Sequence, residues 1–435
     1  MGKILLKSAR VIDPAQKFDG VVDILIINGK IEKIGRVEES ENFEIYDMAG
    51  KVIAPGFVDM HVHLREPGFE HKETIESGVE AGANGGFTAL CCMPNTEPPI
   101  DDPSVVEYVK KRASEVMNGI VDVYPVGAIT KRREGRELAP IAELVEAGVV
   151  GFSDDGNSVQ DSGVMRKAFE YVSMFDKVII QHCEDKTLSQ NGMANEGYWS
   201  TLLGLSPYPD ISEEIILYRD LRLIEYLKPK IKNVKYHIAH ISSRGSVKLL
   251  REYKDAGFEI TAEVTPHHLL LTDEDIWKSN YDTNLKVNPP LKSREDIEVL
   301  IQALKDGTID VIATDHAPHA PEEKESDFAS APFGIIGLET AVGLILSEFV
   351  NKGIISLERM IELFSINPRK ILGLPQMRIR EGEIANFTIL DTEAEWIVDA
   401  GKFKSKSKNS PFVGWKLKGK PVGILNKGKI YWSNL

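Results

Sequence analysis

The chain has 435 residues, of which 42% are hydrophobic and 27% are charged, and its net charge is −14. The length suits one large domain with a smaller one, and the composition is typical of a soluble globular protein. The acidic charge argues against a nucleic-acid partner, because phosphate binding needs a basic surface. No apolar run approaches a membrane span, and the charged N-terminus is no signal peptide, so a cytoplasmic location is expected.

Both ends of the chain alternate apolar and polar residues, as β-strands do. Within residues 4–35 the pair Asn28-Gly29 predicts a hairpin turn, and Asn426-Lys427-Gly428 indicates a turn within residues 385–432. The simplest arrangement pairs the two ends in one small β-sandwich outside the main domain. The predicted domains are residues 1–52 and 371–435, which form the sandwich, and residues 53–370 between them.

Short apolar runs alternate with amphipathic, helix-like segments in the middle of the chain. Helices are expected over residues 102–117, 212–227 and 293–307, the last with Ser293 as its N-terminal cap and Gly307 as its stop. Eight strands alternating with helices predict an α/β fold of the (β/α)8 TIM-barrel type, with a doubly wound sheet as the alternative. The eight apolar runs are residues 56–64, 86–93, 121–129, 149–155, 177–183, 234–242, 258–265 and 310–316.

Most of these runs end in a residue able to do chemistry. In a barrel the C-terminal ends of the strands build the active site, so the fold would bring these distant residues together. In chain order they are His61, His63, Arg65, Asn95, Asp154, Asp155, His182, His240 and Asp315.

The row His61, His63 and Arg65 alternates along one predicted strand, so the three side chains point the same way. Two imidazoles at this spacing can chelate a divalent metal, and the planar fork of Arg65 suits a ligand carboxylate. The alternative is a pair of histidines packed in a core. With His182, His240 and strand-end aspartates added, the donor set favours a metal site, and Zn²⁺ suits it best.

Carboxylates supply the rest of the predicted chemistry. Of Asp154 and Asp155, one is expected to face the metal while the other caps or supports. Asp315 is the candidate for proton transfer, because a carboxylate beside a metal-activated water can accept its proton and pass it on. The alternative for Asp315 is a metal ligand without that role, and the two are not exclusive. Residues 320–334 are polar and irregular, which suits a lid over the strand ends.

The cysteines are not candidate ligands. There are three, with Cys91 and Cys92 adjacent, which is no disulfide framework and fits a reducing compartment. Cys183 follows His182 directly, so strand alternation turns it away as a small buried hydrophobe. His237 faces the other side of its strand and is expected to be structural.

Seven motifs together resemble dihydroorotase, in its bacterial class I form, within the amidohydrolase superfamily. Their order and spacing fit nearly the whole chain. The HxH pattern is shared across the superfamily, whereas "HLREPG" with "MPNT" and "TDHAPH" is much more specific. The motifs are "GFVDMHVHLREPG", "MPNT", "SDDG", "HCED", "AEVTPHHLL", "NPPL" and "ATDHAPH".

The resemblance implies reversible cyclisation of N-carbamoyl-L-aspartate to L-dihydroorotate plus water, a step of pyrimidine (UMP) biosynthesis. It implies that His61 and His63 bind one zinc and that His182 and His240 hold a second, with the metal count left open. It makes Asp315 the catalytic acid/base as well as a metal ligand. The substrate-binding residues it implies are Arg65, Asn95, Asn288, His319, Phe333 and Gly334.

The bridge between the metals departs from the wider superfamily. Many relatives use a carboxylated lysine there, but the fourth run ends in "SDDG" without a lysine, as class I dihydroorotases do. The resemblance therefore makes an aspartate the shared ligand, and Asp155 is chosen because it precedes Gly156, as in the family pattern.

Two other functions compete with this one. A sister cyclic-amide hydrolase, such as an allantoinase or hydantoinase, would share the fold and metal, but the missing lysine and Arg65 disfavour it. A non-catalytic partner subunit of aspartate carbamoyltransferase would characteristically lose metal ligands, and this chain keeps them. Association of an active chain with that transferase stays open, and a homo-oligomer is expected.

Overall fold

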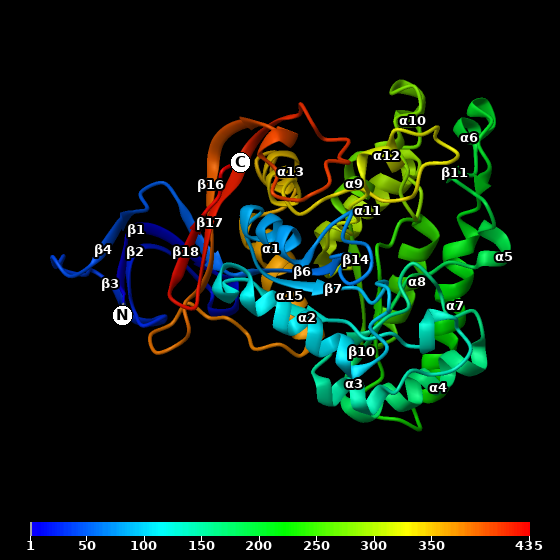
Figure 1. Cartoon of the computed structure of the whole chain (residues 1–435), viewed down its shortest axis with the longest axis horizontal. Helices are drawn as coiled ribbons and strands as arrows, with labels where there is room; N and C mark the ends of the chain where they lie inside the picture. The colour runs from blue at the N-terminus through cyan, green and yellow to red at the C-terminus, as the bar shows by residue number, and fades with distance from the viewer. Residues whose placement is uncertain (1) are drawn as a thin grey trace.

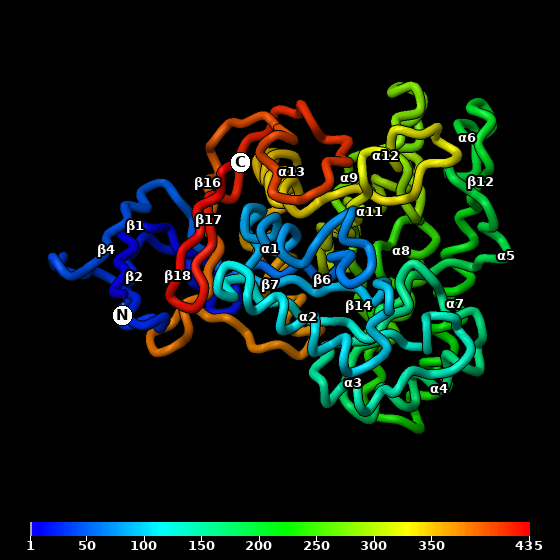
Figure 2. The backbone as a smooth tube through the Cα atoms, viewed as in Figure 1, coloured from blue at the N-terminus to red at the C-terminus, as the bar shows by residue number. Residues whose placement is uncertain are grey.

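The structure is a computed structural model that describes residues 2–435. A barrel of strands, covered by helices, makes up most of the molecule, and a separate sheet lies at one side (Figure 1). The first and last segments of the chain, blue and red in Figure 2, both run through that sheet.

All eight predicted barrel strands are present, and they close into a barrel. Parallel pairing joins the first three strands and, separately, the last five. Parallel bridges from Gly127 to Phe152 and from Val62 to His316 connect the two groups at both edges. This closure confirms the (β/α)8 barrel over the doubly wound sheet. The strands are β6 (Phe57–Val62), β7 (Phe87–Cys92), β8 (Asp122–Pro125), β9 (Gly151–Phe152), β10 (Val178–Gln181), β13 (Lys235–Ile238), β14 (Ile260–Val264) and β15 (Val311–Ile312).

Helices follow the strands and cover the outside of the barrel. In the helix predicted over 293–307, the Asp296 N–H donates to Ser293 Oγ at 3.3 Å, and Gly307 ends the helix with φ +85°. The cap and the stop are therefore confirmed. The main outer helices are α1 (Ile75–Asn84), α2 (Pro103–Glu115), α3 (Ile141–Ala147), α4 (Ser162–Val172), α7 (Ile211–Leu227), α8 (Arg244–Asp255) and α11 (Arg294–Asp306).

Longer connections carry short elements at the C-terminal side of the strands, where a barrel builds its active site. Between β10 and α7 lie α5 (Lys186–Ser189), β11 (Ala194–Asn195), α6 (Tyr198–Leu203) and β12 (Pro207–Tyr208). Between β14 and α11 lie α9 (Pro266–Leu270) and α10 (Glu274–Lys278). After β15 come α12 (Pro321–Lys324), α13 (Ala341–Ile345) and α14 (Leu357–Ile361), and then α15 (Asn367–Leu372). The last of these helices lies at the other end of the barrel, where Asn367 Nδ2 donates to Asp310 O, just before β15, at 2.8 Å.

Two apolar clusters hold the barrel rigid. The larger packs the strands against the outer helices, with Phe152 of β9, Phe169 of α4 and Leu221 of α7 among its members. The smaller contains Cys91 of β7, Ile180 of β10 and other strand residues. Side chains from strands so far apart around the ring meet only inside it, so this cluster fills the barrel below the strand ends. Removing such surface from water is the main stabilising contribution.

The two chain ends form one hydrogen-bonded sheet of order β18-β17-β16-β5-β1-β2-β3, with β4 beside β1. The hairpin predicted at Asn28-Gly29 and the turn predicted at residues 426–428 are confirmed. Asn28, Gly29, Lys427 and Gly428 all have positive φ, as tight two-residue hairpin turns require. The exact domain limits stay a prediction. The strands are β1 (Lys3–Asp13), β2 (Phe18–Ile27), β3 (Lys30–Gly35), β4 (Glu44–Asp47), β5 (Val52–Pro55), β16 (Asn386–Ile397), β17 (Lys416–Asn426) and β18 (Lys429–Trp432).

This sheet curls back on itself. Ile31 donates its N–H to Glu383 O at 2.9 Å, so β3 hydrogen-bonds with the segment that leads into β16. Residues of β1, β2, β16 and β17 consequently share one apolar core, which includes Leu6, Ile24 and Phe387.

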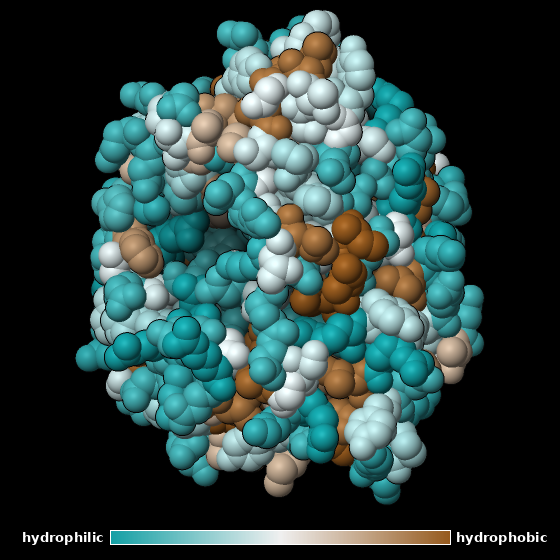
Figure 3. Space-filling model, turned by 90° about the vertical axis from the view of Figure 1, so that its right-hand side faces the viewer, coloured by the Kyte–Doolittle hydropathy of each residue, from teal (hydrophilic) through white to brown (hydrophobic). Residues whose placement is uncertain are grey.

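Most of the surface seen in Figure 3 is hydrophilic, with a hollow and a limited apolar patch beside it. Between residues 2 and 435, no helix combines the length and apolar character needed to cross a membrane.

Candidate metal and substrate site

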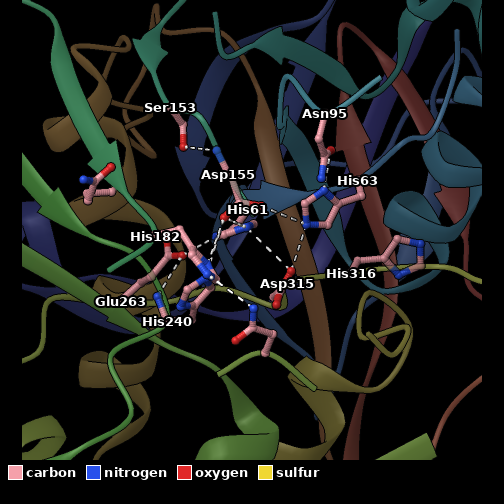
Figure 4. Close-up of polar contacts among 12 residues, drawn as sticks. His61, His63, Asn95, Ser153, Asp155, His182, His240, Glu263, Asp315 and His316 are labelled. Carbon is pink, nitrogen blue, oxygen red and sulfur yellow. Dashed lines mark hydrogen bonds and ion pairs between the residues drawn. The ribbon is translucent and has the colours of Figure 1, made fainter. Parts of the chain in front are cut away.

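Polar side chains from several barrel strands converge at the end of the barrel where the strands finish (Figure 4). Each is fixed by the rigid strand that precedes it, and all are buried. The central residues are His61 in β6, His63 just after it, Asp155 after β9, His182 after β10, His240 after β13 and Asp315 after β15.

A first cluster consists of His61, His63 and Asp155, whose ligand atoms all lie within 4.8 Å of one another. His61 Nε2 is 3.4 Å from Asp155 Oδ1, and His63 Nε2 is 3.5 Å from Asp155 Oδ2. A second cluster consists of Asp155, His182 and His240. There, His182 Nδ1 and His240 Nε2 lie 3.7 and 3.6 Å from Asp155 Oδ1. Asp155 therefore belongs to both clusters.

These residues fit a bound divalent metal. His61 Nε2 and Asp155 Oδ1, which lie 3.4 Å apart, are both buried without a hydrogen-bond partner among residues 2–435. Buried polar atoms rarely go unpaired, because the loss of water is then uncompensated. The separations of 3.4 to 3.7 Å around Asp155 leave space for a cation between nitrogen and carboxylate ligands.

The two adjacent aspartates point to different places. Asp154 accepts hydrogen bonds from the backbone N–H groups of Ile129 (2.9 Å) and Thr130 (3.0 Å) and from the Thr130 hydroxyl. It therefore fixes the loop after β8. Asp155 alone faces the histidines.

Asp315 lies at the edge of the first cluster. Its Oδ1 is 2.9 Å from His63 Nε2 and 3.6 Å from His61 Nε2. The carboxylate also lines the cavity described below, so it contacts both the histidines and the space where a substrate would lie.

The charge distribution keeps both central carboxylates ionised. Burial opposes ionisation of Asp155, but His61 and the neighbouring imidazoles lower its pKa well below the ordinary value. Burial also opposes ionisation of Asp315, but the nearby imidazoles, His61 most of all, lower its pKa below the ordinary value. Anionic oxygen ligands are the form that a metal requires.

Glu263 in β14 is a functional candidate that sequence reasoning missed. Its Oε1 is 2.6 Å from His61 Nδ1, and its Oε2 is 3.1 Å from His237 Nε2. A carboxylate on one ring nitrogen orients the other nitrogen toward a metal. The sequence signal that could have indicated this role is an acidic residue inside the apolar run "FEITAEVT". His237 lies outside both clusters, as expected, but it holds Glu263 in place.

Glu184, in the motif "HCED", was missed as well. Its Oε2 is 2.8 Å from His182 Nε2 and accepts a hydrogen bond from Asn288 Nδ2 at 3.1 Å. His182 thus presents Nδ1 to the second cluster while Nε2 is held by a carboxylate. Cys183 contacts Tyr236 instead, with Sγ and Oη 3.4 Å apart, so it lies outside the site as predicted.

A cavity of about 350 Å³ opens above the clusters, large enough for a small ligand. Every residue that the resemblance implied for substrate binding lies in its wall. Its lining includes His63, Arg65, Asn95, Asp155, His182, His240, Asn288, Asp315, His319, Phe333 and Gly334.

Arg65 contributes a positive charge to the wall of this cavity. It is held by a hydrogen bond from Nε to Pro318 O at 3.1 Å, and its Nη2 is 3.4 Å from His319 Nε2. Burial lowers the pKa of Arg65 to about 10, so the guanidinium stays charged at neutral pH. Asn95 lines the same cavity, with its Oδ1 2.8 Å from His63 Nδ1. The cavity therefore combines a fixed cation with the metal-binding clusters.

The chain was then compared with known proteins. A family model described as dihydro-orotase-like matches residues 50–246. Dihydroorotase from Syntrophus aciditrophicus (strain SB) is 48% identical over 433 residues, covering 99% of both chains. The chain belongs to the dihydroorotase family. Dihydroorotase from Thermoanaerobacter sp. (strain X514) is 49% identical over 431 residues, covering 99% of this chain and 97% of that one.

Solved structures related to this dihydroorotase family member support the fold. L-hydantoinase from Arthrobacter aurescens matches with a TM-score of 0.87 and 27% identity, covering 100% of this chain and 96% of the other. D-hydantoinase from Thermus sp. matches with a TM-score of 0.84 at 22% identity, covering 99% and 95%. The fold of the whole chain is thus shared with these two hydantoinases.

Proposed function

We propose that this chain is a dihydroorotase, which interconverts N-carbamoyl-L-aspartate with L-dihydroorotate and water in pyrimidine (UMP) synthesis. The observation that carries this proposal is the pairing of two histidine clusters around Asp155 with the partly buried guanidinium of Arg65 in one cavity. Full-length identity of 44–49% to eight proteins named dihydroorotase supports the same reaction.

The metal ligands in this proposal are His61 and His63 on one side and His182 and His240 on the other, with Asp155 shared. An all-nitrogen-and-oxygen donor set without thiolates suits Zn²⁺ and supports it over softer metals. Two clusters give room for one or two ions. When bound, the metal supplies Lewis-acid polarisation of the ring carbonyl and activation of water.

Asp315 moves the proton. In the hydrolytic direction its carboxylate accepts the proton released as water adds to the ring carbonyl of dihydroorotate. It then donates that proton to the ring nitrogen, and the C–N bond breaks. Cyclisation follows the same path in reverse. The position of Asp315, 2.9 Å from His63 and in the cavity wall, supports this role as well as a contact with the metal.

Substrate orientation falls to the cavity wall. Arg65 binds the substrate carboxylate through its planar fork, assisted by His319 and Asn95. Asn288 and the backbone at Phe333 and Gly334 contact the rest of the ring. A fixed carboxylate contact holds the reacting carbonyl over the metal site and raises the effective concentration of the reactants.

A hydantoinase activity is the second candidate, because the fold is shared with an L-hydantoinase. The simple hydantoin ring has no carboxylate, so Arg65 in the cavity wall favours dihydroorotate. The experiment compares turnover of L-dihydroorotate, hydantoin and allantoin by the purified, zinc-loaded chain. Selective turnover of dihydroorotate supports the proposal, whereas selective turnover of hydantoin or allantoin contradicts it.

The wider assembly is also a proposal. Homo-oligomerisation and association with aspartate carbamoyltransferase remain predictions. If the zinc-loaded chain does not turn over dihydroorotate alone, the same assay with added transferase tests whether a partner is required.

A further inference from the structure

One wall of the cavity is built from irregular backbone. After α12, residues 325–334 form no helix or strand, and the end of this segment, Pro332 to Gly334, lines the cavity. Buried backbone carbonyls outside regular secondary structure need other hydrogen-bond donors. Two buried lysines, Lys286 and Lys324, supply them.

Lys286 contacts this segment at several points. Its ammonium group donates to Ala329 O at 2.8 Å and to Ala331 O at 2.6 Å. Its own carbonyl accepts the Gly334 N–H at 2.9 Å. The same ammonium lies 4.8 Å from the centre of the Phe333 ring, within cation–π range. One residue thus holds both ends of segment 329–334.

Lys324 ties the segment from the other side. Its ammonium group donates to Thr283 O and to Pro332 O, each at 2.9 Å. Thr283 begins the short turn that ends at Lys286, so the two lysines join the same two pieces of chain. Segment 329–334 is consequently held against residues 283–286 from both sides.

Burial of the Lys286 ammonium group is expected to lower the free energy of unfolding. The Lys286 side chain is only 3% exposed, and within residues 2–435 its polar side-chain contacts are all with backbone carbonyls rather than with a carboxylate. Burying an ammonium group without an anionic partner is unfavourable. The contacts are explained by what they position: Phe333, whose carbonyl accepts a hydrogen bond from His319 Nε2 at 2.8 Å, and Gly334.

We propose that Lys286 is a positioning residue for substrate binding, which fixes segment 329–334 so that Phe333 and Gly334 form a rigid wall of the cavity. This inference rests on the proposed dihydroorotase function. Lys286 does not itself line the cavity, so its effect on the substrate passes through Phe333 and Gly334.

The test compares Lys286→Met, which keeps the apolar stem but removes the donors, with Lys286→Arg, which keeps a charged donor. Lys278→Met is the matched control, because Lys278 is exposed and its ion pairs, to Glu274 and Asp275, lie far from segment 329–334 in the sequence. For each protein, kcat and KM for dihydroorotate, the bound zinc and the exchange of backbone amides in 329–334 are measured.

We expect Lys286→Met to raise KM roughly tenfold, the effect of losing charged hydrogen bonds, while kcat and zinc content change less than about threefold. Amide exchange in 329–334 should accelerate, and Lys286→Arg should restore part of the KM. If Lys286→Met does not fold, the KM of Lys286→Arg decides, with an increase expected because the guanidinium fits the two carbonyls poorly.

A wild-type KM in every folded Lys286 variant would overturn the inference, even if thermal stability fell. That outcome differs from failure of the proposed function, in which the wild-type chain itself would not turn over dihydroorotate.

Discussion

Glu263 and His61 form a buried carboxylate–imidazole pair, with Oε1 and Nδ1 2.6 Å apart. The pair leaves Nε2 of the imidazole facing Asp155. His237 holds the other carboxylate oxygen at 3.1 Å, so the orientation of His61 depends on a chain of three side chains.

Replacing Glu263 by glutamine removes the negative charge behind His61 while keeping the size of the side chain. Metal affinity or activity should fall roughly 10- to 100-fold, because the outer partner of a metal-binding histidine orients it and raises its basicity. Zinc retained after dialysis against a graded chelator measures the effect. Glu259→Gln, an exposed residue just before the same strand, is the control. Equal zinc retention in both folded variants would argue against the orienting role.

Asp154 and Asp155 are adjacent but should give opposite results when changed to alanine. Asp155→Ala should lose bound metal, since both clusters share this carboxylate. Asp154→Ala should keep its metal but lose about 1–3 kcal/mol of unfolding free energy, because three donors lose their acceptor. Metal analysis and denaturant unfolding separate the two. Metal loss only in Asp154→Ala would reverse the assignment.

Asp315→Asn tests the proton-transfer role. The amide cannot accept the proton, so kcat should fall by about 10²- to 10⁴-fold. Metal content should stay near the wild-type level, because the histidines and Asp155 remain. The exposed Asp306→Asn on the outer side of the barrel serves as the comparison. Unchanged turnover in metal-loaded, folded Asp315→Asn would remove Asp315 from the mechanism.

Stability should depend on pH through Lys324. Burial, assisted by the nearby Lys286 ammonium, lowers the pKa of Lys324 from 10.5 to about 7. Between these two values the unfolded chain binds one more proton than the folded chain, so unfolding free energy should rise with pH. Below about pH 7 the lysine is charged in both states, and its contribution becomes constant.

The measurement is the difference in unfolding free energy between wild type and Lys324→Met from pH 6 to pH 10. This difference cancels the other titrating groups and should increase in favour of the wild type above pH 7. A difference that stays flat would mean that the Lys324 pKa is not lowered.

Much of this architecture is readable from the sequence because barrel strands leave a strong signal. Most strands are short, buried and largely apolar runs, and the residues that follow them, such as His182 and Asp315, are polar for a chemical reason. The sequence does not show which of two adjacent aspartates faces the metal site. Periodicity does not decide between Asp154 and Asp155, because that choice depends on where the loop after β8 places its N–H groups.

Contacts between residues that are far apart in the chain are not visible as a pattern in the sequence. Glu263 occupies a strand whose other residues are ordinary core residues. Its role appears only when the folded barrel brings its carboxylate within hydrogen-bonding distance of His61 in β6 and His237 in β13. The polar, irregular sequence of residues 320–334 predicts a lid. In the structure, the ammonium groups of Lys286 and Lys324 donate hydrogen bonds to backbone carbonyls of this segment and hold it against residues 283–286. Whether it closes over substrate stays a prediction.

The most direct test of a metal-dependent dihydroorotase is a zinc titration of the metal-free chain, followed by dihydroorotate hydrolysis at each point. Activity should be absent without zinc, rise with added metal and level off by two equivalents, as expected for two clusters that share Asp155. Full activity in the metal-free chain, or none at saturating zinc with the transferase present, would contradict the account.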